Sequence, residues 1–276
     1  MRSLDLKSCR CALRRIGTLL AALWVGAAAA AEPIPNSMAA LGDSITQAAT
    51  NCGYLVSCPY ESWSAGEDPA VNSHYRRILA KNPLINGRNH NFAVSGAEAD
   101  MLVYQAGLAV YQDVDYITIL IGANDACADS EAEMTPVDTF RSEVRSALDL
   151  ISSGLPNARI LVASVPDVYR LWQVAHNDPA AVWVWSQTQV CQNMLKNPTS
   201  TKATDEKRRQ RVRQRVIDYN TQLAQECALH AHCKFDGNAL FNYPFALSEL
   251  GWDYFHPGIP GQAKFASTTY QAGFNW

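Results

Sequence analysis

The sequence predicts an α/β fold built on a mostly parallel sheet. Short apolar runs alternate with longer segments in which apolar residues recur every three or four positions, as expected when strands alternate with helices. Several of the apolar runs end directly at a glycine or a small polar residue. Hydrophobic residues make up 48% of the chain and charged residues 18%, which is enough apolar material for a sizeable core.

We expect strands at residues 38–41, 89–94, 116–121 and 159–165, and a short fifth candidate at 232–235. The run YITILI at 116–121 is the clearest, since a continuous apolar run is typical of a strand buried on both faces. Two helix faces follow from apolar spacing, the first formed by Phe140, Val144, Leu148 and Ile151 and the second by Val212, Val216, Tyr219, Leu223 and Cys227. Weaker helical patterns cover 98–111 and 260–270. Residues 47–72 are expected to form a long loop, and 167–197 follow neither period.

The first 31 residues have the features of a secretory signal peptide. Five basic residues precede a short apolar segment at 16–25, and small residues at 27–31 offer cleavage sites. We expect cleavage near Ala31, which leaves 32–276 as one domain in a secreted or periplasmic protein. An uncleaved N-terminal anchor is the alternative, but the apolar segment is too short and too rich in alanine to predict a membrane span.

Charge argues against nucleic acid as a partner. The formal net charge of −3 becomes −7 once the leader, with five basic residues and one acidic residue, is removed.

Six cysteines lie beyond the leader, an even number that favours disulfides in an exported chain. Fifteen pairings are possible for six cysteines. Local loop closure favours Cys52 with Cys58 and Cys227 with Cys233, which leaves Cys127 with Cys191. A zinc site at His230, His232 and Cys233 is the competing interpretation, but no CxxC pair accompanies them, and we expect no metal.

Ser44 follows the first predicted strand and is either a helix cap or a nucleophile. A nucleophilic serine needs a base and an acid that orients the base. Asp253 and His256 are three residues apart, and in a helical turn this spacing would place both side chains on one side. The carboxylate could then hold one imidazole nitrogen and leave the other to face Ser44.

The ends of the second and third predicted strands supply candidate donors for an oxyanion. Ligands of open α/β sheets bind beyond the carboxyl ends of the strands, where Ser44, Gly96 and Asn124 fall. The backbone N–H groups of Ser44 and Gly96 and the side-chain amide of Asn124 are the candidates, because neutral donors fixed in advance suit a transient negative charge. A helix beginning just after Ser44 would add partial positive charge.

Four blocks, GDSIT, VSGAEA, IGANDAC and DYFHP, together resemble the GDSL-type, or SGNH, hydrolase family, in the family's order. The resemblance implies a flavodoxin-like three-layer α/β/α sandwich and an ester hydrolase without cofactor. It also implies a triad of Ser44, Asp253 and His256 and an oxyanion hole of Ser44, Gly96 and Asn124. The first block reads GDSI where the family name has leucine. A looser resemblance to the phospholipase B-like branch rests on ESWSAG, NFAVSGAEADML and IGANDAC.

Other residues have simpler interpretations. Ser95 is a rival nucleophile, but Ala93 and Ala97 stand where a G-x-S-x-G elbow needs glycine. Asp43 and Asp125 are expected to accept loop N–H groups. The basic run at 206–215 is interpreted as a solvated helix face more readily than as a lipid contact. His74, His90, His176, His230 and His232 are expected on the surface or in packing, and Trp172, Trp183 and Trp185 either line an acyl pocket or pack in the core.

We therefore expect a monomeric secreted serine ester hydrolase. Its substrates would be short acyl esters or lipid and lysophospholipid esters, with acetylated polysaccharides as an alternative. A binding protein without turnover on the same scaffold is the second alternative.

Overall fold

The computed structural model describes residues 33–53 and 56–276, and the predicted signal peptide lies outside them. Residues Glu32–Trp276 form one compact unit. Within the described residues no helix is long and apolar enough to cross a bilayer.

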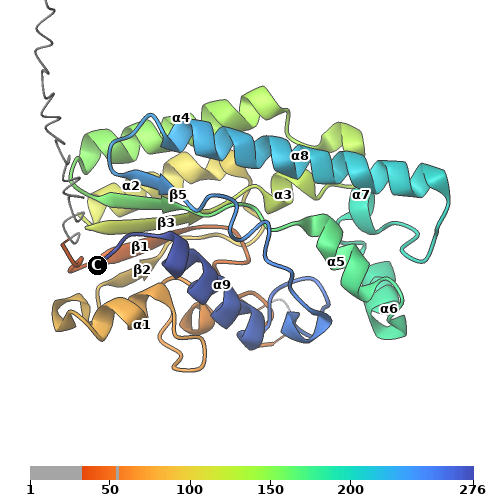
Figure 1. Cartoon of the computed structure of the whole chain (residues 1–276), viewed down its shortest axis with the longest axis horizontal. Coiled ribbons are helices and arrows are strands. Elements are labelled where there is room, and N and C mark those ends of the chain that lie inside the picture. Colours follow the sequence, from red (N-terminus) through yellow and green to blue (C-terminus); the bar gives the residue numbers. More distant parts are fainter. Residues whose placement is uncertain (1–32, 54–55) are drawn as a thin grey trace, which may run out of the picture. The chain divides into compact units, whose positions relative to one another are not determined.

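A single parallel sheet of five strands forms the centre of this unit (Figure 1). The strands are β1 (Met38–Gly42), β2 (Asn89–Asn91), β3 (Tyr116–Leu120), β4 (Arg159–Val162) and β5 (Cys233–Phe235). Their order is β2-β1-β3-β4-β5, which is the flavodoxin-like order and confirms the predicted fold class. The chain crosses from one side of β1 to the other between β2 and β3, so the topological switch point lies between β1 and β3.

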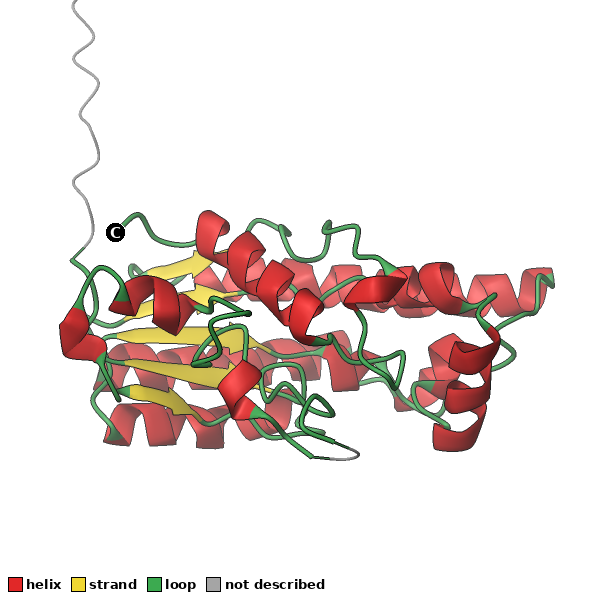
Figure 2. Cartoon of the chain, turned by 90° about the horizontal axis from the view of Figure 1, so that it is seen from below, coloured by secondary structure: helices red, strands yellow, loops and turns green. Residues whose placement is uncertain are grey.

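Helices cover both faces of the sheet. Figure 1 shows α2, α4 and α8 on one face and α1 and α9 on the other, and Figure 2 views the sheet from the α1 and α9 side. The helices are α1 (His74–Leu79), α2 (Leu102–Tyr111), α3 (Ala123–Ala126), α4 (Val137–Gly154), α5 (Val168–Ala175), α6 (Pro179–Thr188), α7 (Gln192–Leu195), α8 (Ala203–Cys227) and α9 (Ile259–Ala272).

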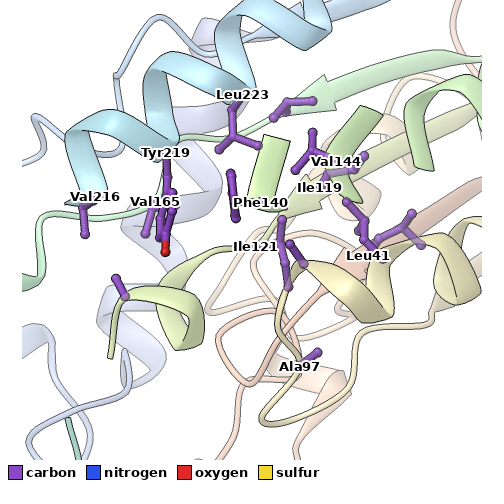
Figure 3. Close-up of a cluster of buried hydrophobic side chains, with 14 of the residues drawn as sticks. Leu41, Ala97, Ile119, Ile121, Phe140, Val144, Val165, Val216, Tyr219 and Leu223 are labelled. Atoms are coloured by element: carbon purple, nitrogen blue, oxygen red, sulfur yellow. The ribbon is translucent and has the colours of Figure 1, made fainter. Parts of the chain in front are cut away.

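Alternation along β1 explains why the sheet needs both layers. Ala39 and Leu41 belong to the large core under α2, α4 and α8, while Met38 and Ala40 pack toward α1 and α9. Successive side chains of a strand point to opposite faces, so a strand that is apolar throughout must be covered twice. Figure 3 shows the larger core, where Phe140 of α4 stacks on Tyr219 of α8 with ring centroids 4.2 Å apart.

Three predicted segments differ from expectation. The second strand ends at Asn91 instead of residue 94, although Val94 still donates its N–H to Gly42 O. The fourth strand ends at Val162 instead of residue 165. The stretch at 167–197, which follows neither period, folds into α5, α6 and α7. Trp185 of α6 is buried and donates its indole N–H to Tyr254 O, so a contact 69 residues away in sequence holds this helix.

Three disulfides join Cys52 to Cys58, Cys127 to Cys191 and Cys227 to Cys233, the pairing that local loop closure favours. Because Cys233 is bonded to Cys227, its sulfur is not a free thiolate for zinc. No cluster of three metal-binding side chains occurs in residues 33–53 and 56–276.

Candidate active site

Ser44 lies at the switch point, in a turn that follows β1 directly. Gly42, the last residue of β1, has φ +146°, and a Cβ there would lie 2.2 Å from Leu120 O of β3. Only glycine therefore allows the chain to leave the sheet at this point. Residues 43–52 form turns and not the helix expected after Ser44. A helix therefore does not begin just after Ser44, and the partial positive charge that such a helix would add does not act at this position.

Two buried glutamines that the sequence analysis missed hold this turn in place. Gln105 of α2 brackets Gly42, because its Oε1 accepts the Gly42 N–H at 2.7 Å and its Nε2 donates to Gly42 O at 2.9 Å. Gln262 of α9 donates to Ile45 O at 2.8 Å and accepts the Trp63 N–H. The sequence did contain a signal for these two residues, because each glutamine occupies a position where the helical pattern calls for an apolar residue.

Ser44, His256 and Asp253 form a continuous hydrogen-bonded row. His256 Nε2 lies 2.8 Å from Ser44 Oγ, and His256 Nδ1 lies 2.6 Å from Asp253 Oδ2. The Asp253 carboxylate accepts a hydrogen bond from Nδ1–H, which leaves Nε2 as an acceptor for the serine hydroxyl. The turn after β1 and a loop more than 200 positions later thus bring the three predicted triad residues together.

Asp253 and His256 are joined by a tight turn and not by the helical turn that their spacing suggests. Asp253 Oδ1 accepts the backbone N–H groups of Phe255 and His256, each at 3.0 Å, and Tyr254 between them has φ +55°. Leu250 and Pro257 pair as an antiparallel bridge that closes the turn. Burial alone would raise the pKa of Asp253, but the hydrogen bond and charge of His256 hold that pKa below its ordinary value. The carboxylate therefore stays ionised beside the imidazole.

The predicted oxyanion donors lie on two loops, which carry Ser44 and Gly96, and on the short helix α3, which carries Asn124. Asn124 is on α3, just after β3, and its Nδ2 donates to Ala97 O at 2.8 Å, one residue beyond Gly96. In the described part of the chain, neither the Ser44 N–H nor the Gly96 N–H donates to another protein group. A Cβ on Gly96 would meet no atom within 4 Å, but φ is +82°, so the backbone conformation and not crowding calls for glycine here.

Two buried acids next to these donors accept loop N–H groups, as expected. Asp43 accepts the Ile45 N–H at 2.8 Å, and Asp125 accepts the Ala99 N–H. Burial raises the pKa of Asp43 to about 6 against the opposing effects of that N–H and of His256. Burial likewise raises the pKa of Asp125 to about 7. Burial therefore favours the neutral, protonated form of both carboxyls, and the N–H groups only partly offset this effect.

The model of the GDSL-like lipase/acylhydrolase family matches residues 40–264, which include all of these groups. The chain belongs to this family. Membership places it among hydrolases of the esterase and lipase type, in agreement with the resemblance of the four sequence blocks.

Individual relatives of this GDSL-family chain are distant. Membrane-associated phospholipase B1 of Rattus norvegicus is 28% identical over 175 residues, which are 51% of this chain and 12% of that protein. The Mus musculus protein of the same name is 28% identical over 145 residues, or 43% of this chain and 10% of its own length. The chain thus spans about a tenth of these relatives.

Solved structures of similar fold include phospholipase A1 from Streptomyces albidoflavus NA297, with 18% identity and a TM-score of 0.46 over 85% of this chain and 95% of that chain. A family 3 carbohydrate esterase from Clostridium thermocellum has 14% identity and a TM-score of 0.47 over 85% of this chain and 93% of its own.

An apolar pocket opens beside the serine of this GDSL-family site. Its space is about 640 Å³, counting the mouth that opens to solvent. Ser44, Asn124 and His256 line one part of it. The apolar walls are formed by side chains from α5, α9 and the segment between β5 and α9, namely Val168, Leu171, Phe245, Leu250, Phe255 and Phe265.

The tryptophans considered for an acyl pocket do not line this one. Trp185 is buried in the core, Trp183 is 64% exposed on α6, and Trp172 stacks on the guanidinium of Arg209 at 4.2 Å. Arg209 itself is fully buried, so the basic run at 206–215 is not simply a solvated face. Several of its other arginines pair with carboxylates, as Arg211 does with Glu131 and Arg213 with Asp167.

The remaining candidates have structural contacts. Ser95 Oγ hydrogen-bonds to Ser57 Oγ, and no hydrogen bond to a histidine involves it in the described residues. His74 is buried between Tyr116 and Thr269, whose hydroxyl oxygens lie 2.8 Å from its two ring nitrogens. His230 contacts Ser152 Oγ at 2.9 Å.

Proposed function

We propose that this GDSL-family hydrolase cleaves carboxylic esters through an acyl-enzyme on Ser44, with the acyl chain in the apolar pocket. The observation that carries the proposal is the hydrogen-bonded row of Ser44, His256 and Asp253 at the wall of that pocket. A serine hydroxyl bound to an imidazole that a carboxylate holds is the arrangement that activates a serine for acyl transfer.

In the proposed reaction Ser44 Oγ attacks the acyl carbonyl while His256 Nε2 takes its proton. The negative charge on the carbonyl oxygen is stabilised by the N–H groups of Ser44 and Gly96 and by the Asn124 amide, each a neutral donor fixed before reaction. His256 then gives its proton to the leaving alcohol. Water, deprotonated by the same imidazole, releases the acid and restores Ser44. The residues present supply every proton transfer in this sequence.

Apolar walls favour acyl groups longer than acetyl, because burial of each methylene contributes about 0.8 kcal/mol. Short and medium acyl esters, including lipid and lysophospholipid esters, are therefore the proposed substrates. Acetylated polysaccharides are the alternative substrate class.

Three disulfides fit an oxidising compartment, and together with the basic, apolar and small-residue segments of the leader they support the proposal that the chain is exported. N-terminal sequencing of protein from the culture medium or the periplasm tests it. We expect a mature chain that begins near Glu32, and a chain retained with Met1 would contradict export by cleavage.

The decisive experiment for the reaction compares wild type with Ser44→Ala. We expect the variant to fold normally and to lose ester turnover by roughly three orders of magnitude or more, because the nucleophile is gone. A fluorophosphonate probe should label wild type at Ser44 and leave the variant unlabelled. Ser95→Ala is the matched control and should keep both activity and labelling.

A series of p-nitrophenyl esters of increasing acyl length, tested beside lysophosphatidylcholine and acetylated xylan, identifies the substrate class. Turnover confined to acetylated xylan would support the polysaccharide alternative. Absence of labelling and of turnover on every ester would support a binding protein on this scaffold.

A further inference from the structure

A second groove borders the other side of His256. It is lined by Thr50, Gln187, Thr188, Trp252, Phe255 and His256, with Val190 and Asp253 completing its walls. Phe255 and His256 line both this groove and the apolar pocket beside Ser44. These two residues thus form a ridge between the two spaces. Apart from His256 and Asp253, the residues that line the groove have no part in the reaction described so far.

The proton transfer in ester cleavage determines which part of a substrate lies on each side of this ridge. His256 delivers its proton to the oxygen of the leaving alcohol, so the alcohol must lie next to His256 while the acyl chain lies by Ser44 and Asn124. An ester whose acyl part fills the apolar pocket therefore projects its alcohol part across the ridge. The second groove begins on that side of the ridge.

The two spaces differ in their walls. Apolar side chains such as Val168 and Leu171 line the first, whereas the second offers the amide of Gln187 and the hydroxyl oxygen of Thr188, both on exposed residues at the end of α6. The Thr188 hydroxyl donates to Val184 O at 3.0 Å, so it can accept from a ligand. Trp252 adds a broad aromatic face that is 47% exposed. Its indole N–H donates to Thr50 O at 3.1 Å, which fixes the orientation of the ring.

We propose that this second groove binds the alcohol part of the ester substrate and that this alcohol is polyhydroxylated. The inference rests on the proposed ester hydrolase function. An aromatic face packs against the C–H face of a polyol or sugar ring, while neutral amide and hydroxyl groups exchange hydrogen bonds with its hydroxyls. A glycerol moiety and a sugar share this chemistry.

A cationic alcohol such as choline fits the groove less well. Aromatic faces do attract quaternary ammonium groups, usually with help from nearby negative charge. Asp253 is the acidic residue among those lining the groove, and both of its oxygens are engaged, Oδ2 by His256 and Oδ1 by two backbone N–H groups. Gln187 and Thr188 are neutral, so the polar wall is suited to hydroxyls.

The test uses four butyrate esters that differ only in their alcohol: ethanol, glycerol, methyl glucoside and choline. The measured quantity is kcat/KM for each ester relative to the ethyl ester. We expect Trp252→Ala to lower this ratio about tenfold for the glycerol ester, the glucoside ester or both, the upper range of an aromatic contact. Gln187→Leu, which removes the amide at similar volume, should lower the same ratio severalfold. Trp183→Ala, an exposed tryptophan of α6 outside both spaces, is the matched control and should leave the ratio unchanged.

A ratio that stays constant in Trp252→Ala and Gln187→Leu would overturn the inference, since a merely structural change would lower all four reactions alike. A choline ester ratio that falls more than the polyol ratios would also overturn it. A ratio that falls only for the glycerol ester would indicate a lipid substrate, and a ratio that falls only for the glucoside ester would indicate a saccharide substrate.

Binding without turnover provides a second measurement. Saturation-transfer NMR with butyryl methyl glucoside and butyryl glycerol on Ser44→Ala should show contact with the alcohol protons, and this contact should be lost in Ser44→Ala/Trp252→Ala. Full turnover by Ser44→Ala would refute the proposed function instead. Turnover that needs Ser44 but is indifferent to the groove would refute only this inference.

Discussion

Asp125 accepts the backbone N–H of Ala99 with both carboxylate oxygens, at 3.1 and 3.3 Å. The residue before it, Asn124, donates its side-chain amide to Ala97 O. Two successive residues of α3 therefore hold the loop that carries Gly96. The spacing between Gly96 and Asn124, two of the three proposed oxyanion donors, depends on these contacts, so Asp125 is a positioning residue in the proposed site.

Replacing Asp125 should impair both folding stability and turnover. We expect Asp125→Ala to lower the free energy of unfolding by about 1–3 kcal/mol, because the buried Ala99 N–H loses its acceptor. Ester turnover should fall by roughly tenfold or more as Gly96 loses its fixed position. Urea denaturation and kcat on a p-nitrophenyl ester measure the two effects. Asp125→Asn, which keeps an acceptor oxygen, should recover most of the turnover, and Asp129→Ala on the exposed surface should change neither quantity. Equal losses of turnover in both Asp125 variants would contradict the positioning role.

Asp125 also predicts a pH dependence of stability. Burial raises its pKa from 3.8 to about 7 in the folded chain. The unfolded chain therefore releases this proton first as pH rises, and the free energy of unfolding should fall between about pH 4 and pH 7, by at most about 1.4 kcal/mol per pH unit. The difference between wild type and Asp125→Asn isolates this contribution. Parallel stability curves for the two proteins would show that Asp125 does not titrate in this way.

His74 should produce a slope of opposite sign. Burial lowers its pKa from 6.5 to about 3, with a smaller contribution from the charge of Arg77. Below pH 6.5 the His74 imidazole binds a proton in the unfolded chain but stays neutral in the folded chain. The free energy of unfolding should therefore fall as pH falls from about 6.5 toward 3. Thermal unfolding of wild type and His74→Gln across this range measures it. The prediction fails if the stability difference between the two proteins does not change with pH.

Filling the apolar pocket should shorten the preferred acyl chain. Val168 lines this pocket from the first turn of α5, and we expect Val168→Phe to lower kcat/KM for octanoyl esters about tenfold relative to acetyl esters, because the larger ring takes the space of the longer chain. A series of p-nitrophenyl esters measures the ratio. Gln173→Phe, on the exposed side of the same helix, serves as control. An unchanged ratio would mean that the acyl chain binds elsewhere.

The three disulfides should differ in their contribution to stability. Cys127 and Cys191 are 64 residues apart, whereas the other two pairs are each 6 apart. Loop entropy predicts a loss of about 4 kcal/mol for Cys127→Ala/Cys191→Ala and about 2 kcal/mol for Cys227→Ala/Cys233→Ala. Urea denaturation without reductant tests the order of the two losses. If the loss from Cys227→Ala/Cys233→Ala were the larger, the effect of this disulfide on stability would come from packing and not from chain entropy.

The central strands and the site could be predicted because both follow local rules. Strands β1, β3 and β4 are buried on both faces, so each reads as an apolar run. Ser44, Gly96 and Asn124 follow the ends of three strands, where ligands of such sheets bind. Edge strand β2 was harder to delimit, since its three residues are Asn89, His90 and Asn91 and none is fully buried.

Other features depend on contacts that sequence spacing does not contain. Gln105 and Gln262 hold the Ser44 turn from helices 63 and 217 residues away in the chain. The turn from Asp253 to His256 has helical spacing without helical geometry, because Asp253 Oδ1 takes the N–H groups that a helix would use. The apolar pocket is built from α5, α9 and the segment before α9, so its walls could not be identified before these elements were placed together.

The bracket that Gln105 forms around Gly42 has a consequence for how this enzyme can diversify. Gly42, two residues before Ser44, is attached to α2 by two buried hydrogen bonds, whereas Val168, Leu171 and Phe245 come from elements beyond that framework. Substitutions in the pocket walls alter the ligand without passing strain to the nucleophile. Natural or laboratory evolution can therefore change the acyl preference with little loss of the ester-cleaving activity. A change at Gln105, in contrast, would lower the activity on every substrate.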